Sequence, residues 1–257
     1  MSAEPPRARP PDTRRDRIAA LTILHLDAHV VAVDKPAGLL SVPGRGAAPS
    51  VVELLRRDPR LADNAAARVV HRIDREASGV LLLARTLAAQ QDLVRQFMRR
   101  TVHKTYLALV SGFVEADGEV DLPLLFDPRR QRVRAVASRG KPALTRYRVV
   151  QRVAGGTVLE CEPVTGRTHQ IRVHLAAIGH PLLVDPVYGS GEGVFLSTYK
   201  PGYRTSKRHD ERPLIDRLTL HAARLSCTHP ATGEPLELAA PLPKDLRATL
   251  TQLGRLV

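Results

Sequence analysis

A nine-residue stretch followed by an apolar run constrains the fold of this chain more than any other part of its sequence. The stretch, His71–Gly79, places Asp74 between Arg72 and Arg75 and leads directly into Val80–Ala84, in which every side chain is apolar. An apolar run of this length beside polar residues is typical of a strand. The sequence therefore predicts a strand that starts next to an acid surrounded by cations, a combination that adds little to packing but is suited to chemistry.

Short segments with the composition of strands dominate the rest of the chain, and only a few helices separate them. Such runs of strands are typical of the α+β class and not of a regularly alternating βαβ arrangement. We therefore expect an α+β protein built around a sheet. Further strands are expected at 22–26, 30–33, 106–110, 143–150, 157–162, 217–227 and 236–239, and a strand or ribbon is expected at 129–136.

Two helices are indicated by side chains that cap helix N-termini. Ser50 and Glu53 form the pattern of a capping box, which predicts a short helix that ends before Pro59. Thr86 precedes a longer helix expected at 87–100. The apolar stripe of that helix comprises Leu87, Leu93, Val94, Phe97 and Met98.

A third helix is expected at 167–178, because Gly179 and Pro181 follow it in the way that glycine and proline follow a helix C-terminus. Arg167–His174 would place polar, mostly cationic side chains on its first two turns. A helix N-terminus favours anions, so these cations either need an acid or a phosphate opposite them or form a solvated face. Leucines within 246–253 predict a C-terminal helix.

The length of 257 residues fits one large domain, which we place at residues 21–257. Residues 1–20, rich in Pro and Arg, are expected to form a disordered basic tail because they offer nothing to bury. We find no signal peptide and no apolar run that could span a membrane, so we expect a cytoplasmic monomer. Cys161 and Cys227 lie in alternating apolar runs and are expected to be buried thiols.

The charge of the chain indicates a polyanionic partner. Lys and Arg number 39 against 26 Asp and Glu, which gives a net charge of +13, and only six of the 39 cations are Lys. Arginine forks match phosphate oxygens and stack on bases, which favours nucleic acid, although a codon bias toward Arg would give the same count. Residues 189–213 form a polar and basic insertion. His169 and His174 lack an acidic or thiol partner at ligand spacing, so we expect no metal and no cofactor.

Asp74 is open to two interpretations. On the surface it would form an ion pair with Arg72 or Arg75, which contributes little to stability. As a catalyst it needs polar partners from elsewhere in the chain. Each segment that could supply them also has an ordinary structural role, as a core strand or a solvated face. These segments are Lys104–Tyr106, Arg167–His174 and Leu220–Leu225.

Taken in order, these segments resemble the RluA-type family of RNA pseudouridine synthases, from about Val30 to Pro243. Ala77 departs from the family pattern, which usually has Thr beside the essential acid. Many relatives carry an N-terminal S4 RNA-binding domain, for which the residues before the first strand are too few, so we expect RNA to bind through the catalytic domain. The matching segments are Val33–Gly44, His71–Gly79, Lys104–Tyr106 with Leu109–Val110, Gly166–His174, Gly179–Pro181, Asp185–Gly189 and Leu220–Ala222.

The resemblance implies that Asp74 is the essential acid and that Arg172 is its ion-pair partner, which would hold the carboxylate in place and in its charged form. Formation of pseudouridine breaks the N1–C1′ bond of uridine, turns the uracil and rejoins it through C5. A carboxylate beside the sugar could attack C1′, as the nucleophile of a retaining glycosidase does. It could instead remove the C2′ proton, and both routes remain open.

The resemblance also implies roles for five residues that contact the RNA. Tyr106 matches the tyrosine that packs against the target base, and its hydroxyl is a candidate for removing the C5 proton. Arg72 aligns with the residue that fills the gap left by the flipped base. Lys35, Arg167 and His169 are expected to contact phosphate or substrate.

The implied protein is a cofactor-free isomerase of uridine in rRNA or tRNA. Its implied fold is a mixed, mainly antiparallel sheet with flanking helices and a central basic catalytic cleft. The alternative is a non-catalytic RNA-binding or RNA-remodelling protein with the same fold. Retention of Asp74, Tyr106 and Arg172 favours the enzyme. A DNA-binding or generic basic scaffold would explain the charge but none of the matching segments.

Overall fold

The structure of the chain, a computed structural model, describes residues 21–44, 48–61, 67–204 and 210–257. The predicted tail at residues 1–20 lies outside the described residues. The strands are β1 (Thr22–Leu26), β2 (Val30–Lys35), β3 (Arg68–Val69), β4 (Ser78–Ala84), β5 (His103–Ser111), β6 (Gly118–Asp121), β7 (Leu124–Asp127), β8 (Arg132–Ala135), β9 (Leu144–Val153), β10 (Gly156–Pro163), β11 (Leu220–Thr228) and β12 (Pro235–Ala239). The helices are α1 (Val51–Arg56), the 3-10 helix η2 (Pro59–Leu61), α2 (Leu87–Arg99), α3 (Gln170–Ala177), α4 (Leu196–Tyr199) and α5 (Lys244–Gly254).

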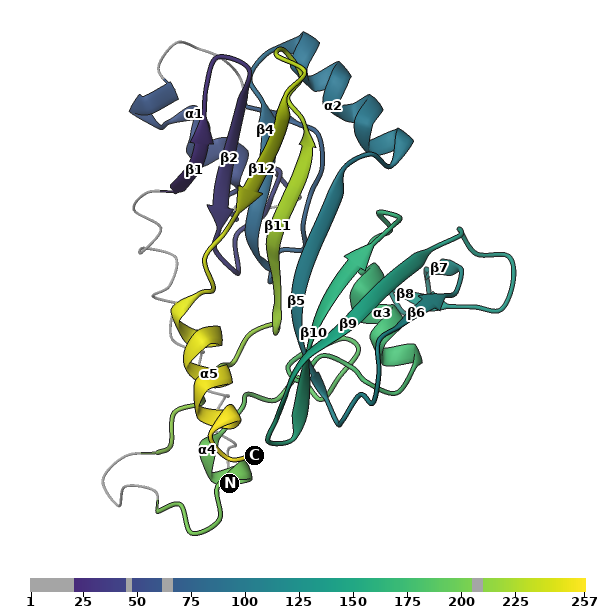
Figure 1. Cartoon of the computed structure of the whole chain (residues 1–257), viewed down its shortest axis with the longest axis vertical. Helices are drawn as coiled ribbons and strands as arrows, with labels where there is room; N and C mark the ends of the chain where they lie inside the picture. Colours follow the sequence, from purple (N-terminus) through teal and green to yellow (C-terminus); the bar gives the residue numbers. More distant parts are fainter. Residues whose placement is uncertain (1–20, 45–47, 62–66, 205–209) are drawn as a thin grey trace, which may run out of the picture.

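One large sheet carries both halves of the molecule. Its strand order is β1-β2-β4-β11-β5-β10-β9-β6, with β12 paired to β11 and β3 to β4. The pairs are antiparallel except for β4 with β11, which is parallel. The predicted α+β class with a mixed, mainly antiparallel sheet is therefore confirmed. Figure 1 shows α2 beside one half of the sheet and α3 beside the other. No described helix is long and apolar enough to cross a membrane.

The apolar run after the charged stretch forms β4, and all seven residues of this strand are buried. Its side chains alternate between two hydrophobic cores, as the twofold repeat of a strand requires. Val80 and Leu82 pack in the core that contains Leu93 of α2. Leu81 and Leu83 pack on the opposite face, in the core that contains residues of α1. The strand that follows the charged stretch is thus held from both sides.

The predicted starts of two helices are confirmed by their caps. The hydroxyl of Ser50 accepts a hydrogen bond from the N–H of Glu53 at 3.3 Å, and the Glu53 carboxylate accepts one from the N–H of Ser50 at 2.9 Å. These two bonds are the two halves of a capping box. The hydroxyl of Thr86 accepts a hydrogen bond from the N–H of Ala89 at 3.1 Å at the start of α2. Arg100, with a left-handed φ of 60°, ends this helix.

The strand or ribbon expected at 129–136 contains β8, which pairs with β7 in a hairpin, so the strand itself begins only at Arg132. A carboxylate oxygen of Asp127 accepts hydrogen bonds from the N–H groups of Arg129 and Arg130 and fixes the turn. The prediction that a helix begins at residue 167 is wrong. His169 has a left-handed φ of 55°, which is not helical, so α3 begins at Gln170.

Two further expectations are only partly met. Leu93 of α2 is buried, but Leu87 and Met98 of the predicted apolar stripe are 54% and 77% exposed. The polar insertion at 189–213 contributes Val194 and Tyr199 to a hydrophobic core with α5, while its residues 205–209 lie outside the described residues. Helix α4 lies within the described part of the insertion. Both cysteines are buried free thiols, as predicted.

Gly79 is required where β4 meets β11. Its φ is +111°, and a Cβ at this position would lie 2.1 Å from the carbonyl oxygen of Ala222. Gly233 also has a positive φ, +75°, but a Cβ there would meet nothing within 4 Å. Gly233→Ala should therefore lower the free energy of unfolding by about 1–2 kcal/mol through backbone strain alone.

Gly79→Ala adds overpacking to this strain, and we expect it to lower the free energy of unfolding by about 3–5 kcal/mol. Urea titrations of the two variants measure the difference. Equal losses in both variants would show that the close approach of β4 and β11 does not require glycine.

Candidate active site

A cleft of about 530 Å³ lies where the charged stretch before β4 meets β5, the C-terminal end of α2 and the start of α3. The sheet order explains why these segments meet: β4 and β5 flank β11, and β10, which leads toward α3, lies next to β5. Six of the seven site residues predicted from the sequence line this cleft. They are Arg72, Asp74, Tyr106, Arg167, His169 and Arg172.

A buried arginine joins two carboxylates at the centre of the cleft. Nε and Nη2 of Arg172 donate to the two carboxylate oxygens of Asp185, each at 2.8 Å. Its third nitrogen, Nη1, donates to Asp74 at 3.0 Å. The ion pair expected between Asp74 and Arg172 is therefore present. Arg75, considered above as an alternative partner, instead lies 3.5 Å from the carboxylate of Glu76.

The surroundings of Asp185 and Arg172 favour the charged forms of both side chains. Burial acts to raise the pKa of Asp185, but hydrogen bonds from Arg172 and from the N–H groups of Val187 and Tyr188 outweigh it and lower the pKa. Burial acts to lower the pKa of Arg172, and the two carboxylates outweigh it and raise the pKa. The guanidinium also lies over the ring of Tyr188, 5.0 Å from its centroid, a favourable cation–π contact.

The backbone on both sides of Asp74 is tied to the loop after β2. The hydroxyl of Ser41 donates to the carbonyl of Ile73 at 2.8 Å and accepts a hydrogen bond from its N–H at 3.2 Å. The N–H of Gly38 donates to the carbonyl of Arg75 at 2.9 Å. The acid between Ile73 and Arg75 is therefore presented by a loop with fixed ends.

Lys35 supports this loop from inside the protein. Its side chain is fully buried, and Nζ donates to the carbonyls of Pro36 at 3.0 Å, Leu39 at 2.8 Å and Arg75 at 2.9 Å. The prediction that Lys35 contacts phosphate or substrate is wrong, because an ammonium group has three donors and all three are used here. Burial lowers the pKa of Lys35 to about 7, and the charges of Glu76 and Asp74 act in the opposite direction.

Tyr106 on β5 lines the cleft near Asp74. Burial raises the pKa of its hydroxyl well above the usual range, and the charge of Asp74 raises it further. The side chain is therefore a neutral phenol at physiological pH. It offers the cleft an aromatic face, on which a base can stack, and a hydroxyl donor.

Two other predicted residues, Arg72 and His169, each contact a neighbouring side chain. Nη2 of Arg72 donates to the hydroxyl of Thr168 at 3.3 Å and so links the charged stretch to the loop before α3. Nδ1 of His169 lies 3.0 Å from the hydroxyl of Tyr188. Burial lowers the pKa of His169, so its ring is neutral at pH 7. A neutral imidazole can orient a substrate by hydrogen bonds but adds no positive charge.

Sequence reasoning missed three side chains that build the site. Asp185 and Tyr188 hold Arg172, yet they entered only as part of a matching segment, without a role. An acid directly after the apolar residues 182–184 was the available signal. Gln170 holds the loop before α3, because its side-chain oxygen accepts hydrogen bonds from the N–H of Arg167 at 3.0 Å and the hydroxyl of Thr165 at 2.6 Å.

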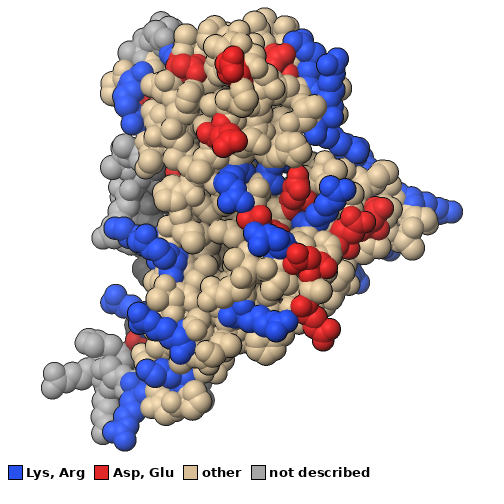
Figure 2. All heavy atoms as spheres, viewed as in Figure 1, with Lys and Arg blue, Asp and Glu red and all other residues tan. Residues whose placement is uncertain are grey.

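The cations of the cleft differ from those on the sheet surface. Figure 2 shows basic and acidic side chains side by side across the middle of one face. On the sheet surface, Glu160 of β10 forms ion pairs with Arg148 of β9 at 3.3 Å and with Arg224 of β11 at 2.6 Å. Within the described part of the chain, neither Arg72 nor Arg167 has a carboxylate at ion-pair distance. The cleft therefore presents positive charge that is free to bind phosphate.

Comparison with known proteins identifies the family. The sequence profile described as RNA pseudouridylate synthase matches residues 29–177, more than half of the chain. The chain belongs to this family. Its resemblance to RluA-type members is confirmed by the dual-specificity RNA pseudouridine synthase RluA of Escherichia coli. That protein is 42% identical over 226 residues, which are 86% of this chain and 93% of the relative.

Other family members give the same result. Ribosomal large subunit pseudouridine synthase D of Nitrosomonas europaea is 43% identical over 92% of this chain, and the chain spans 66% of the length of that relative. The solved structure of human RNA Pseudouridylate Synthase Domain Containing 4 has a TM-score of 0.67 at 26% identity. The likeness covers 90% of this chain and 92% of that one. The pseudouridine synthase fold is therefore confirmed.

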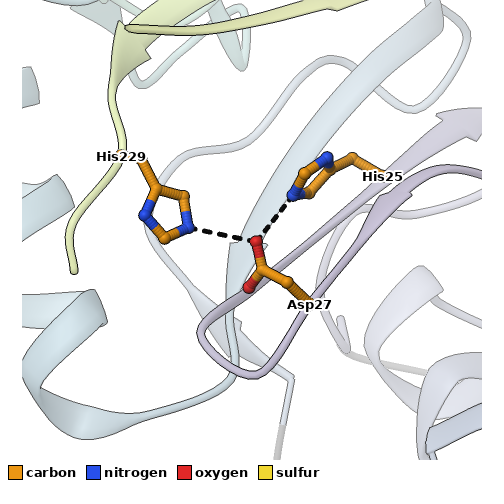
Figure 3. Close-up of side chains that lie close together, drawn as sticks. All are labelled: His25, Asp27 and His229. Carbon is orange, nitrogen blue, oxygen red and sulfur yellow. Dashed lines mark hydrogen bonds and ion pairs between the residues drawn. The ribbon is translucent and has the colours of Figure 1, made fainter. Parts of the chain in front are cut away.

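Figure 3 shows a second cluster of polar side chains, His25, Asp27 and His229, none of which lines the cleft. One carboxylate oxygen of Asp27 lies 2.6 Å from Nε2 of His25 and 3.0 Å from Nε2 of His229. Such a set has the residue types of a metal site, but Nδ1 of His229 accepts hydrogen bonds from the N–H groups of Ala231 and Thr232. Nε2 of His229 must then carry the proton.

A histidine that binds a metal has the opposite arrangement, because its second ring nitrogen donates a hydrogen bond. The cluster fits a hydrogen-bonded link between the turn after β1 and the turn after β11. The other carboxylate oxygen of Asp27 accepts hydrogen bonds from the N–H groups of His29 and Val30 at 2.7 and 2.8 Å.

Asp27 should make the stability of the protein depend on pH. Burial acts to raise the pKa of its carboxyl group, but hydrogen bonds from His25, His29, Val30 and His229 outweigh it and lower the pKa far below the usual value. This stabilisation is complete above the unfolded pKa of about 3.9 and is lost as the pH falls toward the folded pKa.

Asp27→Asn cannot titrate, so its free energy of unfolding should fall less between pH 5 and pH 3 than that of the wild-type protein. Urea titrations at the two pH values provide the measurement. If the free energy of unfolding fell equally in Asp27→Asn and in the wild-type protein between pH 5 and pH 3, the proposed link would be contradicted.

Proposed function

We propose that this chain is an RNA pseudouridine synthase that isomerises specific uridines in structured RNA. The observation that carries the proposal is the buried Arg172, which holds Asp74 in a basic cleft lined by Tyr106, in a member of the pseudouridylate synthase family. The charge on Asp74 has a fixed partner, and the aromatic face lies within the same cleft. This set provides an acid for the sugar and a surface for the base.

The reaction needs an ionised carboxylate beside the ribose. In one route Asp74 attacks C1′ as uracil leaves through N1, and the detached uracil turns and attacks C1′ through C5, which displaces the Asp74 carboxylate. In the other route Asp74 removes the C2′ proton as uracil leaves, the turned uracil adds through C5 to C1′ of the glycal-type intermediate, and the proton returns to C2′. Both routes end when C5 loses its proton and N1 gains one. Arg172 serves both routes, because its hydrogen bond fixes the position of the Asp74 carboxylate.

The other cleft residues retain the base and the backbone. A uridine must leave its stack to reach Asp74, at a cost of a few kcal/mol. Stacking on Tyr106 offsets part of this cost and keeps the detached uracil in place while it turns. Arg72 fills the gap that the uridine leaves, and Arg167 and His169 bind phosphate or sugar oxygens at the edge of the cleft.

The proposed RNA is large-subunit rRNA or tRNA. The names of the relatives support this choice, since one is a ribosomal large subunit pseudouridine synthase and another a dual-specificity RNA pseudouridine synthase. Within the described residues, Arg72 and Arg167 have no carboxylate at ion-pair distance. They support RNA as the partner, because such cations bind its phosphates. We further propose that the protein acts as a cytoplasmic monomer and that the isomerisation uses neither a metal nor a cofactor.

The second candidate function is RNA binding or remodelling without catalysis, on the same fold. The basic cleft alone would serve it. The observation against it is Asp185, which is fully buried and accepts two hydrogen bonds from Arg172. A protein that only bound RNA would not need a guanidinium fixed toward one carboxylate.

The test compares Asp74→Asn with Glu76→Gln, which removes the charge of a neighbouring acid in the same loop. Asp74→Asn should lower pseudouridine formation by more than about 1,000-fold, because the amide can neither attack C1′ nor accept the C2′ proton. Its affinity for RNA should change little. Glu76→Gln should retain turnover.

Pseudouridines are mapped in large-subunit rRNA and tRNA after incubation with each protein. Wild-type turnover by Asp74→Asn would contradict the role of Asp74. RNA binding by the wild-type protein without any pseudouridine would favour the non-catalytic function.

A further inference from the structure

The cleft continues past the residues assigned to the target uridine. Val94, Phe97 and Met98, on the last two turns of α2, line this second part. Met98 is 77% exposed, and Phe97 stacks on His71 with ring centroids 4.9 Å apart and an angle of 26°. Apolar side chains gathered at the wall of a cleft indicate a ligand that covers them.

Two cations flank this apolar wall. Arg100 ends α2 in a left-handed conformation and is exposed, and Lys104 on β5 is half-buried. Both line the cleft, and within the described residues neither has a carboxylate at ion-pair distance. An apolar face beside unpaired cations has the chemistry of a site for a nucleotide, in which the base stacks and the phosphate is neutralised.

We propose that Val94, Phe97 and Met98 form a second base-binding subsite, which receives the base next to the target uridine in the same RNA strand. Arg100 and Lys104 bind the phosphate of that nucleotide. The proposal rests on the proposed function, because it takes the first subsite to hold the uridine. A uridine that leaves its stack exposes one face of its neighbour, and the subsite replaces the contact that this neighbour loses.

The segment between the two subsites supports this arrangement. His71 stacks on Phe97 at one end, and Asp74 lies three residues further along the same segment. Nε2 of His71 accepts a hydrogen bond from the N–H of Leu82 in β4 at 3.0 Å, so the segment is fixed to the sheet. Because the wall is apolar, it reads the faces of a base and not its edges, and we expect it to accept different bases.

The test uses Met98→Ser, with Leu87→Ser as the matched control on the same helix. Both side chains are exposed, but Leu87 does not line the cleft. The first probe is a labelled single-stranded RNA heptamer with a central uridine. In the second probe an abasic ribose replaces the nucleotide on the 5′ side of this uridine, and in the third probe it replaces the nucleotide on the 3′ side. Fluorescence anisotropy gives the dissociation constants at several salt concentrations.

Met98→Ser should weaken binding of the intact heptamer at least about fivefold, the lower end of the effect of base stacking. It should change binding by less than about twofold when the abasic ribose replaces the base that occupies the subsite. The salt dependence should stay the same, because no charge is removed. Leu87→Ser should bind all three probes as the wild-type protein does.

Equal losses on all three probes, no loss on any probe, or no binding of the heptamer to the wild-type protein would overturn the proposal. The dissociation constants do not require turnover, so they test the subsite separately from catalysis. Failure of the wild-type protein to form pseudouridine in rRNA or tRNA would count against the proposed function alone.

Discussion

The candidate site depends on one guanidinium buried between two carboxylates. Arg172 is 6% exposed, and moving such a charge out of water costs several kcal/mol unless its hydrogen bonds are satisfied. Asp185 satisfies two of its nitrogens and is itself held by two backbone N–H groups. The third nitrogen is left for Asp74. The pair with Asp185 thus fixes a cation at the place where Asp74 needs one.

The sheet brings together residues that are far apart in the chain. Asp74 precedes β4, and Tyr106 lies on β5, two strands away across β11. The next strand in the sheet, β10, leads to α3 and Arg172. The parallel pairing of β4 with β11 requires Gly79, since any side chain there would meet the backbone of Ala222. A feature of strand packing therefore determines where the loop that carries Asp74 ends.

Sequence reasoning succeeded where short-range chemistry determines the structure. The apolar residues of β4 and the capping box of Ser50 and Glu53 carry their signals within a few residues. The pairing of Asp74 with Arg172 joins residues 98 positions apart, so no local pattern contains it, and only the resemblance to a family predicted it.

The predictions for Lys35 and Met98 failed for the same physical reason. Lys35 looked like a free cation because the carbonyls that bind it include one from Arg75, 40 positions away. Met98 looked like a core residue because helical periodicity does not show which part of an apolar stripe the sheet covers. In both cases tertiary contacts outside the local sequence decide what the side chain does. Met98 is also where the structure suggests an additional role.

The central claim is that Asp185 controls catalysis by holding Arg172 toward Asp74. The most direct measurement is the single-turnover rate of Asp185→Asn with saturating RNA, normalised to the fraction of folded protein from a urea titration. The account predicts a rate about 100-fold below wild type, as expected when a catalytic group is misplaced by about 1 Å, with little change in RNA affinity. A folded Asp185→Asn variant that reacts within about twofold of the wild-type rate would contradict it.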